Sequence, residues 1–177
     1  MPQQKSRKIL IYIFLFLIIG TLNNKNLTKT NFIKLDTITV TGLEEKNNID
    51  LVNKLNFLKF DNLMFLDKSQ IVDILNSNTL IEKFFVIKKY PSTLNIEIQK
   101  TEFLAQTKKE NKNFFLGSNG KLTRADNFRS DMPYIFGEFK NKDFFELKKA
   151  VDESNFRYNQ IKKLFFYKSG RWDIEMN

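Results

Sequence analysis

The sequence predicts an α+β protein with an N-terminal transmembrane helix, a strand–helix–helix–strand–strand domain and then a mostly β domain. Three observations predict this fold. Residues 9–22 form an uncharged apolar run. Residues 32–104 place two stretches with helical spacing between stretches that are typical of strands. Residues 105–177 carry short strand-like stretches, and Asn119-Gly120 favours a hairpin there because both residue types tolerate positive φ.

The apolar run reads ILIYIFLFLIIGTL and follows three cations, Lys5, Arg7 and Lys8. A helix of this length spans about 21 Å, less than the roughly 30 Å of a hydrocarbon core. The run is interpreted either as a cleaved signal peptide or as a short uncleaved anchor. Gly20 follows two isoleucines, so an A-x-A-like cleavage pattern is missing and the anchor is favoured. The cations place residues 1–8 in the cytoplasm and the folded part outside it.

A polar linker at residues 23–31 leads into the first domain, which is expected to begin with a strand. The apolar positions of that strand are Ile33, Leu35, Ile38 and Val40. Their alternation slips between Leu35 and Ile38, which indicates a bulge or a change of face. Gly42 ends the strand as a turn residue.

Two helices and two strands are expected to complete the first domain. Asn48 and Asp67 are the candidate N-caps of the helices. The helical apolar positions are Ile49, Val52 and Leu55 in the first helix, and Ile71, Ile74 and Leu75 in the second. Residues 80–90 are rich in Phe and β-branched residues, and residues 94–98 alternate apolar with polar side chains. These patterns predict two strands joined by a turn at Pro91.

The second domain is expected to be mostly β. Its candidate strands are residues 105–108, 114–117, 121–124, 161–167 and 171–176, and its one candidate helix is residues 143–154. The last strand alternates Trp172 and Ile174 with Arg171 and Asp173, so one face is apolar and the other charged. Trp172 is interpreted as core filler, with an interface anchor as the alternative.

Composition narrows the function classes. The chain has no cysteine and no histidine, which excludes disulfides, thiolate nucleophiles and the commonest general base and transition-metal ligand. No phosphate-binding glycine loop, metal-ligand spacing or catalytic triad is present. The net charge of +9 comes partly from cations beside the apolar run, while residues 32–104 hold nine lysines and ten acids. We therefore expect no enzyme, cofactor, metal, small-molecule substrate or nucleic acid.

An ordered set of short motifs resembles the FtsQ/DivIB bacterial cell-division family. The motifs are ITVTG at residues 38–42, YPSTLNI at 90–96, LA at 104–105, FLGSNG at 115–120, MPYIFG at 132–137 and RWDI at 171–174. The resemblance covers nearly the whole chain. It implies a cytoplasmic tail (1–8), a membrane span (9–22), a linker (23–31), a POTRA domain (32–104) and a β domain (105–177). The structural turn positions within these motifs are Gly42, Pro91, Asn119, Gly120, Pro133 and Gly137.

The chain departs from the family pattern in two places. A Glu-Arg pair and a proline usually precede the position of Leu104, where this sequence has Lys100, Thr101 and Phe103. Family members also continue beyond the position of Asn177 with further β elements. The resemblance therefore implies an incomplete β domain, with an open strand edge at residues 171–176.

The resemblance implies a non-enzymatic division scaffold in the cell inner (cytoplasmic) membrane at the division septum, with most of the chain in the periplasm. Its partners would be membrane-anchored proteins of the FtsB/FtsL type, and it would help control septal peptidoglycan synthesis. Main-chain pairing at a sheet edge would bind the partner. The resemblance places the main contact in the further β elements, and Arg171, Trp172, Asp173 and Ile174 are the candidate contact residues within this sequence. The alternatives are a POTRA-bearing component of outer-membrane protein assembly or secretion, and a surface-anchored enzyme.

Overall fold

The computed structural model describes residues 8–16 and 34–176. Residues 8–16 are helical, and the large apolar side chains at positions 9–16 are 48–78% exposed. In these two described ranges, no helix is both long enough and apolar enough to cross a membrane. Part of the expected transmembrane helix at 9–22, most of the expected tail at 1–8 and the whole expected linker at 23–31 lie outside the described residues.

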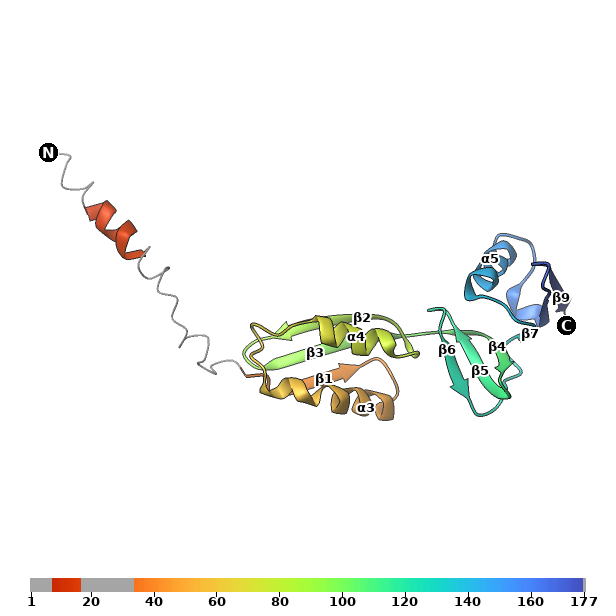
Figure 1. Cartoon of the computed structure of the whole chain (residues 1–177), viewed down its shortest axis with the longest axis horizontal. Coiled ribbons are helices and arrows are strands. Elements are labelled where there is room, and N and C mark those ends of the chain that lie inside the picture. The colour runs from red at the N-terminus through yellow and green to blue at the C-terminus, as the bar shows by residue number, and fades with distance from the viewer. Residues whose placement is uncertain (1–7, 17–33, 177) are drawn as a thin grey trace.

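The first folded unit has the predicted strand–helix–helix–strand–strand order (Figure 1). Its elements are β1 (Thr37–Thr41), α3 (Glu45–Leu55), the 3-10 helix η1 (Asn56–Phe60), α4 (Ser69–Ser77), β2 (Ile81–Lys89) and β3 (Thr93–Lys100). The sheet order is β1-β3-β2, with β1 parallel and β2 antiparallel to the central strand β3. A parallel pair needs a long crossover, and the two helices with β2 provide it.

One hydrophobic core holds this unit together. Ile38 and Val40 of β1 lie in register with Leu94 and Ile96 of β3, so their side chains share one face of the sheet. The helices contribute Leu51, Leu55, Ile71 and Leu75 to the same buried cluster. The apolar face of the strands therefore packs against the apolar face of the two helices, as expected for amphipathic elements.

The phase slip before β1 has a structural cause. Leu35 is buried, but its backbone N–H donates to the Asp61 carbonyl oxygen at 3.1 Å. Lys34 forms an isolated antiparallel bridge with Asn62. The sheet strand itself begins only at Thr37. The expected strand from residue 33 therefore consists of two pieces that pair with different neighbours.

The predicted cap of the first helix is wrong. Helix α3 begins at Glu45, so Asn48 lies inside it, where its side chain accepts from the Leu43 N–H (3.2 Å) and donates to the Leu43 carbonyl (3.0 Å). Ile49, expected on the core face, is exposed. Asp67 lies just before α4 and accepts from the Ser69 N–H at 2.9 Å, and this hydrogen bond lowers the pKa of the Asp67 carboxyl.

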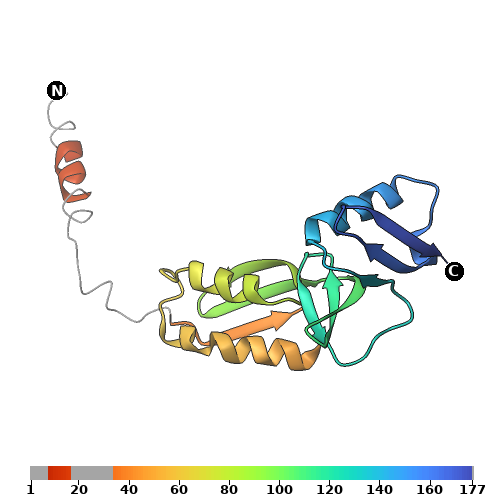
Figure 2. The same ribbon diagram turned by 45° about the vertical axis from the view of Figure 1, so that its right-hand side comes forward.

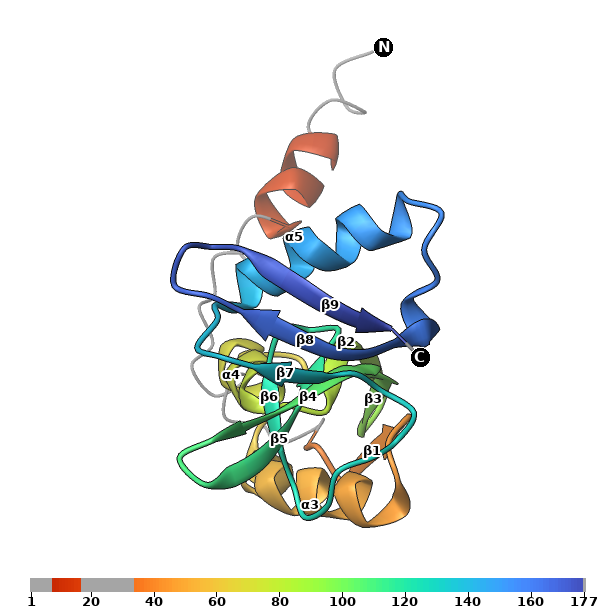
Figure 3. The same cartoon turned by 90° about the vertical axis from the view of Figure 1, so that its right-hand side faces the viewer.

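The second unit forms one six-stranded sheet with a single longer helix. Its elements are β4 (Phe103–Lys109), β5 (Lys112–Gly117), β6 (Leu122–Ala125), β7 (Tyr134–Phe136), α5 (Asn141–Asp152), the 3-10 helix η2 (Tyr158–Gln160), β8 (Ile161–Phe166) and β9 (Trp172–Met176). The strand order is β6-β5-β4-β7-β8-β9, and Figure 3 shows β4, β7, β8 and β9 in this succession. The mostly β character is confirmed, whereas the short strand β7 was not predicted.

Strand β7 joins the two hairpins of the second unit into one sheet. It pairs in parallel with β4 on one side and with β8 on the other. Helix α5 makes the crossover from β7 to β8, and its Phe144 is fully buried against Ile135 and Leu164. Burial of a phenylalanine of this kind stabilises a fold by roughly 1.5–3 kcal/mol. The second unit therefore has a core of its own.

We expect Gly42→Ala to destabilise the first unit far more than Gly170→Ala destabilises the second. Both glycines have positive φ, but a Cβ at Gly42 would lie 1.8 Å from the Ile98 carbonyl oxygen, whereas nothing lies within 4 Å of a Cβ at Gly170. The Gly42 variant should lose at least about 2 kcal/mol more. Thermal unfolding followed by circular dichroism measures the difference, and equal losses would contradict it.

Candidate partner-binding surface

The turn between β5 and β6 fastens the second unit to the first. The Asn119 side-chain amide donates to the carbonyl oxygens of Thr79 and Ile81, both at 2.9 Å. The Lys121 ammonium donates to the Asn76 and Asn78 carbonyls at the end of α4, where the helix dipole favours a cation. Asn119-Gly120 was predicted as a hairpin turn, but the contacts of its side chain with the first unit were not.

A second set of hydrogen bonds closes the same junction. Thr101, buried between β3 and β4, lies 3.0 Å from the Ser118 hydroxyl oxygen. Ser118 in turn donates to the Glu82 carboxylate at 2.7 Å, and its own N–H donates to the Glu102 carbonyl at 2.7 Å. The network joins β2, the β3–β4 connection and the β5–β6 turn. It therefore restrains the orientation of one sheet relative to the other.

The candidate contact residues 171–174 lie in and just before strand β9. The Arg171 guanidinium pairs with Asp173 at 3.0 Å and stacks 4.8 Å from the Tyr167 ring centroid. Trp172 packs against the rings of Phe166 (4.7 Å) and Phe139 (6.1 Å), so it serves partly as core filler. Ile174 shares the face of Trp172 but is 40% exposed. The apolar face of β9 is therefore covered at Trp172 and open at Ile174.

Strand β9 is one edge of the sheet within residues 34–176. The Tyr167 N–H donates to the Arg171 carbonyl at 3.0 Å, which marks a hydrogen-bonded pair of the β8–β9 hairpin. Such pairs alternate with non-bonded ones, so Phe165 with Asp173 is the next bonded pair. The backbone groups of Trp172 and Ile174 then point away from β8. Their N–H and C=O groups are therefore available to form hydrogen bonds with an added strand.

A row of aromatic rings crosses the sheet face opposite α5. Phe128 packs on Tyr134 with centroids 5.0 Å apart, Tyr134 on Phe136 at 4.3 Å, and Phe136 on Phe165 at 4.9 Å in a stacked arrangement. Phe128 and Phe136 are exposed. Sequence reasoning missed this row because β7 was not recognised. The alternation of Tyr134 and Phe136 around the buried Ile135 was the available signal.

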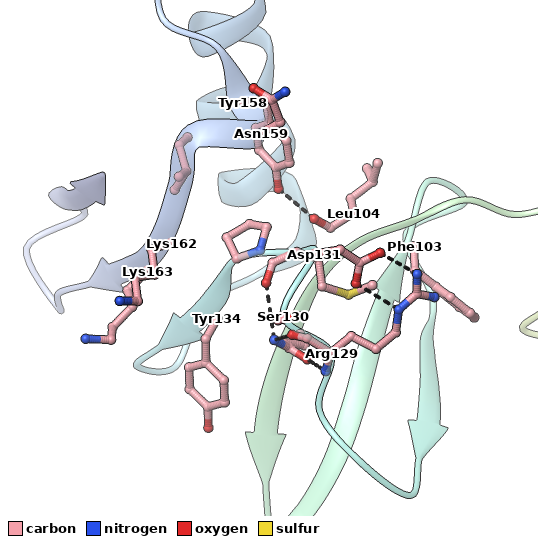
Figure 4. A pocket seen from close by; sticks show the side chains of 14 residues that line it. Phe103, Leu104, Arg129, Ser130, Asp131, Tyr134, Tyr158, Asn159, Lys162 and Lys163 are labelled. Carbon is pink, nitrogen blue, oxygen red and sulfur yellow. Dashed lines mark hydrogen bonds and ion pairs between the residues drawn. The ribbon is translucent and has the colours of Figure 1, made fainter. Parts of the chain in front are cut away.

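A shallow pocket of about 610 Å³ opens between the loop before β7 and the start of β8 (Figure 4). Arg129 and Asp131 form an ion pair on one wall, which lowers the pKa of the Asp131 carboxyl. Tyr158 donates its hydroxyl to the Leu104 carbonyl at 2.8 Å, and burial raises its pKa above the usual range. These two interactions engage the Asp131 carboxylate and the Tyr158 hydroxyl.

The remaining predicted turn positions determine the local backbone conformation or make backbone contacts. Pro91 follows a cis peptide bond in the β2–β3 turn. Pro133 is buried, and its carbonyl accepts from the Gln106 N–H at 2.9 Å. Gly137 has φ +96°, and a Cβ there would lie 2.2 Å from the Phe166 carbonyl oxygen. Among the residues that the structure describes, no cluster of three or more His, Cys, Asp or Glu side chains could hold a metal ion.

Comparison with known proteins gives two kinds of match. Residues 33–100 match the family model described as POTRA domain, FtsQ-type. The cell division protein DivIB of Staphylococcus aureus strain NCTC 8325 / PS 47 is 30% identical over 127 residues, and that of strain MRSA252 is 29% identical over 127 residues. Each alignment covers 69% of this chain and 29% of the relative. The chain thus matches less than a third of the length of these relatives.

We expect Asn119→Asp to loosen the junction between the two units. A carboxylate cannot donate to the Thr79 and Ile81 carbonyls and would place a charge against them, so stability should fall by about 1–3 kcal/mol. Limited proteolysis should also cut more readily near residues 101–104. Asn111→Asp, in the exposed β4–β5 turn, is the matched control. Equal cutting rates in both variants would show that the amide does not restrain the junction.

Proposed function

Because this chain belongs to the FtsQ/DivIB family, we propose that it is a non-enzymatic bacterial cell-division scaffold. It binds other division proteins outside the cytoplasm at the division septum and helps control septal peptidoglycan synthesis. The FtsQ-type POTRA domain at residues 33–100 and the two DivIB relatives support the division role. The absence of His and Cys from the sequence supports a role without catalysis or cofactors.

The proposed layout follows the order of the sequence. Residues 1–8 form a cytoplasmic tail, residues 9–22 a single membrane span and residues 23–31 a linker. The POTRA domain (32–104) and the β domain (105–177) then lie in the periplasm. The two separate buried clusters, one in each unit, support this division of the folded part.

The proposed binding mode is strand addition at β9, with a membrane-anchored partner of the FtsB/FtsL type. The observation that carries it is the edge position of β9 in the described part of the chain, with the backbone of Trp172 and Ile174 directed outward. The exposed Ile174 side chain gives a partner side chain an apolar surface to pack on, and the Arg171–Asp173 ion pair lies beside it. Main-chain pairing provides affinity, and these side chains provide selectivity.

Replacement of Ile174 by proline tests this mode. The Ile174 N–H points away from β8, so proline removes a donor for the partner without removing a hydrogen bond of the β8–β9 hairpin. We expect binding of a soluble FtsB-type fragment to weaken at least about tenfold, because a lost bond leaves the partner carbonyl unpaired. Binding is measured by isothermal titration calorimetry on the full chain.

Ile174→Val is the control for this experiment. It keeps the N–H and the apolar β-branched side chain, so the partner should bind nearly as it does to the unaltered chain. Circular dichroism should give the same unfolding midpoint for both variants within a few degrees. Full binding by the Ile174→Pro variant would exclude strand addition at β9.

The membrane anchor is tested separately. We expect the chain extracted from membranes to retain its first residues, because the residues around Gly20 do not form a signal-peptidase cleavage pattern. Lys5, Arg7 and Lys8 should keep the N-terminus in the cytoplasm. Mass spectrometry of the intact protein gives the mature N-terminus. An N-terminus between residues 20 and 31 would instead identify a signal peptide.

A further inference from the structure

Five large apolar side chains lie exposed at one end of the first unit. They are Phe57, Phe60, Met64, Phe65 and Tyr90, here called the entry-end patch, and their exposed fractions run from 45% to 84%. Large apolar groups left in water favour contact with another apolar phase. The same segment contributes Leu58, Leu63 and Leu66 to the core of the unit, whereas the patch residues are not part of that buried cluster.

The patch lies at the end of the unit where the chain arrives from the N-terminal apolar run. The loop between α3 and α4 and the β2–β3 turn lie together at this end (Figure 1), and Lys34 forms a bridge with Asn62 of that loop. Hydrogen bonds tie them to one another: Leu35 N–H donates to the Asp61 carbonyl, and the Lys88 ammonium to the Met64 carbonyl at 3.3 Å. The patch is therefore part of a fixed surface.

Charge is divided unevenly along the same unit. The entry end comprises residues 34–36, the segment from the last turn of α3 to the start of α4, and the β2–β3 turn with the end of β2. Its charged residues are Lys34, Lys54, Lys59, Lys68, Lys88 and Lys89 against Asp36, Asp61 and Asp67. Six of the nine lysines of residues 32–104 are thus at this end, with only three of the ten acids. The entry end carries a net charge of +3 and the remainder of the unit −4. A surface with both exposed rings and excess cations suits an anionic lipid headgroup layer.

We propose that the entry-end patch docks on the surface of an anionic phospholipid bilayer, next to the point where the chain leaves the membrane. This inference rests on the proposed anchor at residues 9–22. Eleven residues separate Leu22 from Lys34, and they reach at most about 40 Å even when fully extended. The anchor thus confines the patch near the headgroups. Its aromatic rings enter the interface while the lysines pair with lipid phosphates.

Fluorescence quenching in nanodiscs tests this docking. The chain has no cysteine, so Asn56→Cys allows an environment-sensitive dye to be attached beside the patch, and Gln99→Cys allows it near the opposite end of the unit. The labelled full-length chain is placed in discs of phosphatidylglycerol and phosphatidylcholine that contain a spin-labelled lipid. We expect quenching at position 56 and none at position 99. Phosphatidylcholine alone or high salt should abolish it, since salt screens the lysines.

Matched substitutions inside and outside the patch test whether the contact with the bilayer is specific to the patch. Phe65 and Phe85 are equally exposed, at 66% and 65%, but Phe85 is on β2 away from the patch. Phe65→Ser should therefore reduce quenching and Phe85→Ser should leave it unchanged. Lys59→Gln should weaken docking about fivefold at low salt, as expected for one cation at an anionic surface. Lys83→Gln, outside the patch, should have no effect.

The outcomes distinguish this inference from the anchor. A chain that stays with the discs but shows no quenching at position 56 in either lipid mixture would overturn the docking and leave the anchor intact. Equal quenching with and without phosphatidylglycerol would overturn the charge-based recognition. A chain that separates from the discs would overturn both proposals.

Discussion

The hydrogen bonds from the β5–β6 turn to the first unit determine how the rest of this molecule is arranged. Asn119 donates to the carbonyl oxygens of Thr79 and Ile81 at the start of β2, and Ser118 bonds to Glu82 and Thr101. Each of these groups is partly or fully shielded from water, so an unmade bond would leave a polar atom without compensation. The two cores could fold beside each other in many orientations, and this polar junction selects one.

That orientation separates two surfaces of different chemistry. The first unit turns its positive, aromatic end toward the chain entry and its other end toward the junction. Beyond the junction, the sheet runs from β6 to β9, and Figure 2 shows β4 to β6 beside the first unit with the C-terminal hairpin farther along. Lipid contact at one end and partner contact at β9 would therefore not compete. A partner anchored in the same membrane would reach β9 alongside both units.

Local patterns were most informative where a residue's role depends on its sequence neighbours. The alternation of Leu94, Ile96 and Ile98 predicted β3, and helical spacing predicted α4 and α5. Asn48 was misread because a capping residue and a residue that bonds backward to Leu43 have the same short polar side chain. Strand β7 is only three residues long, too short for its period to be distinguished from a loop.

By itself, the sequence determined the α+β class, the order of most elements, the Asn119-Gly120 turn and the family resemblance. Each of these depends on spacing along the chain or on motifs read in order. Tertiary structure alone decided the strand order of the second sheet, the second role of Asn119 and the gathering of Phe60, Phe65 and Tyr90 at one end. These features depend on which segments distant in the sequence pack or pair with each other, and the periodicity of a segment does not predict its partner.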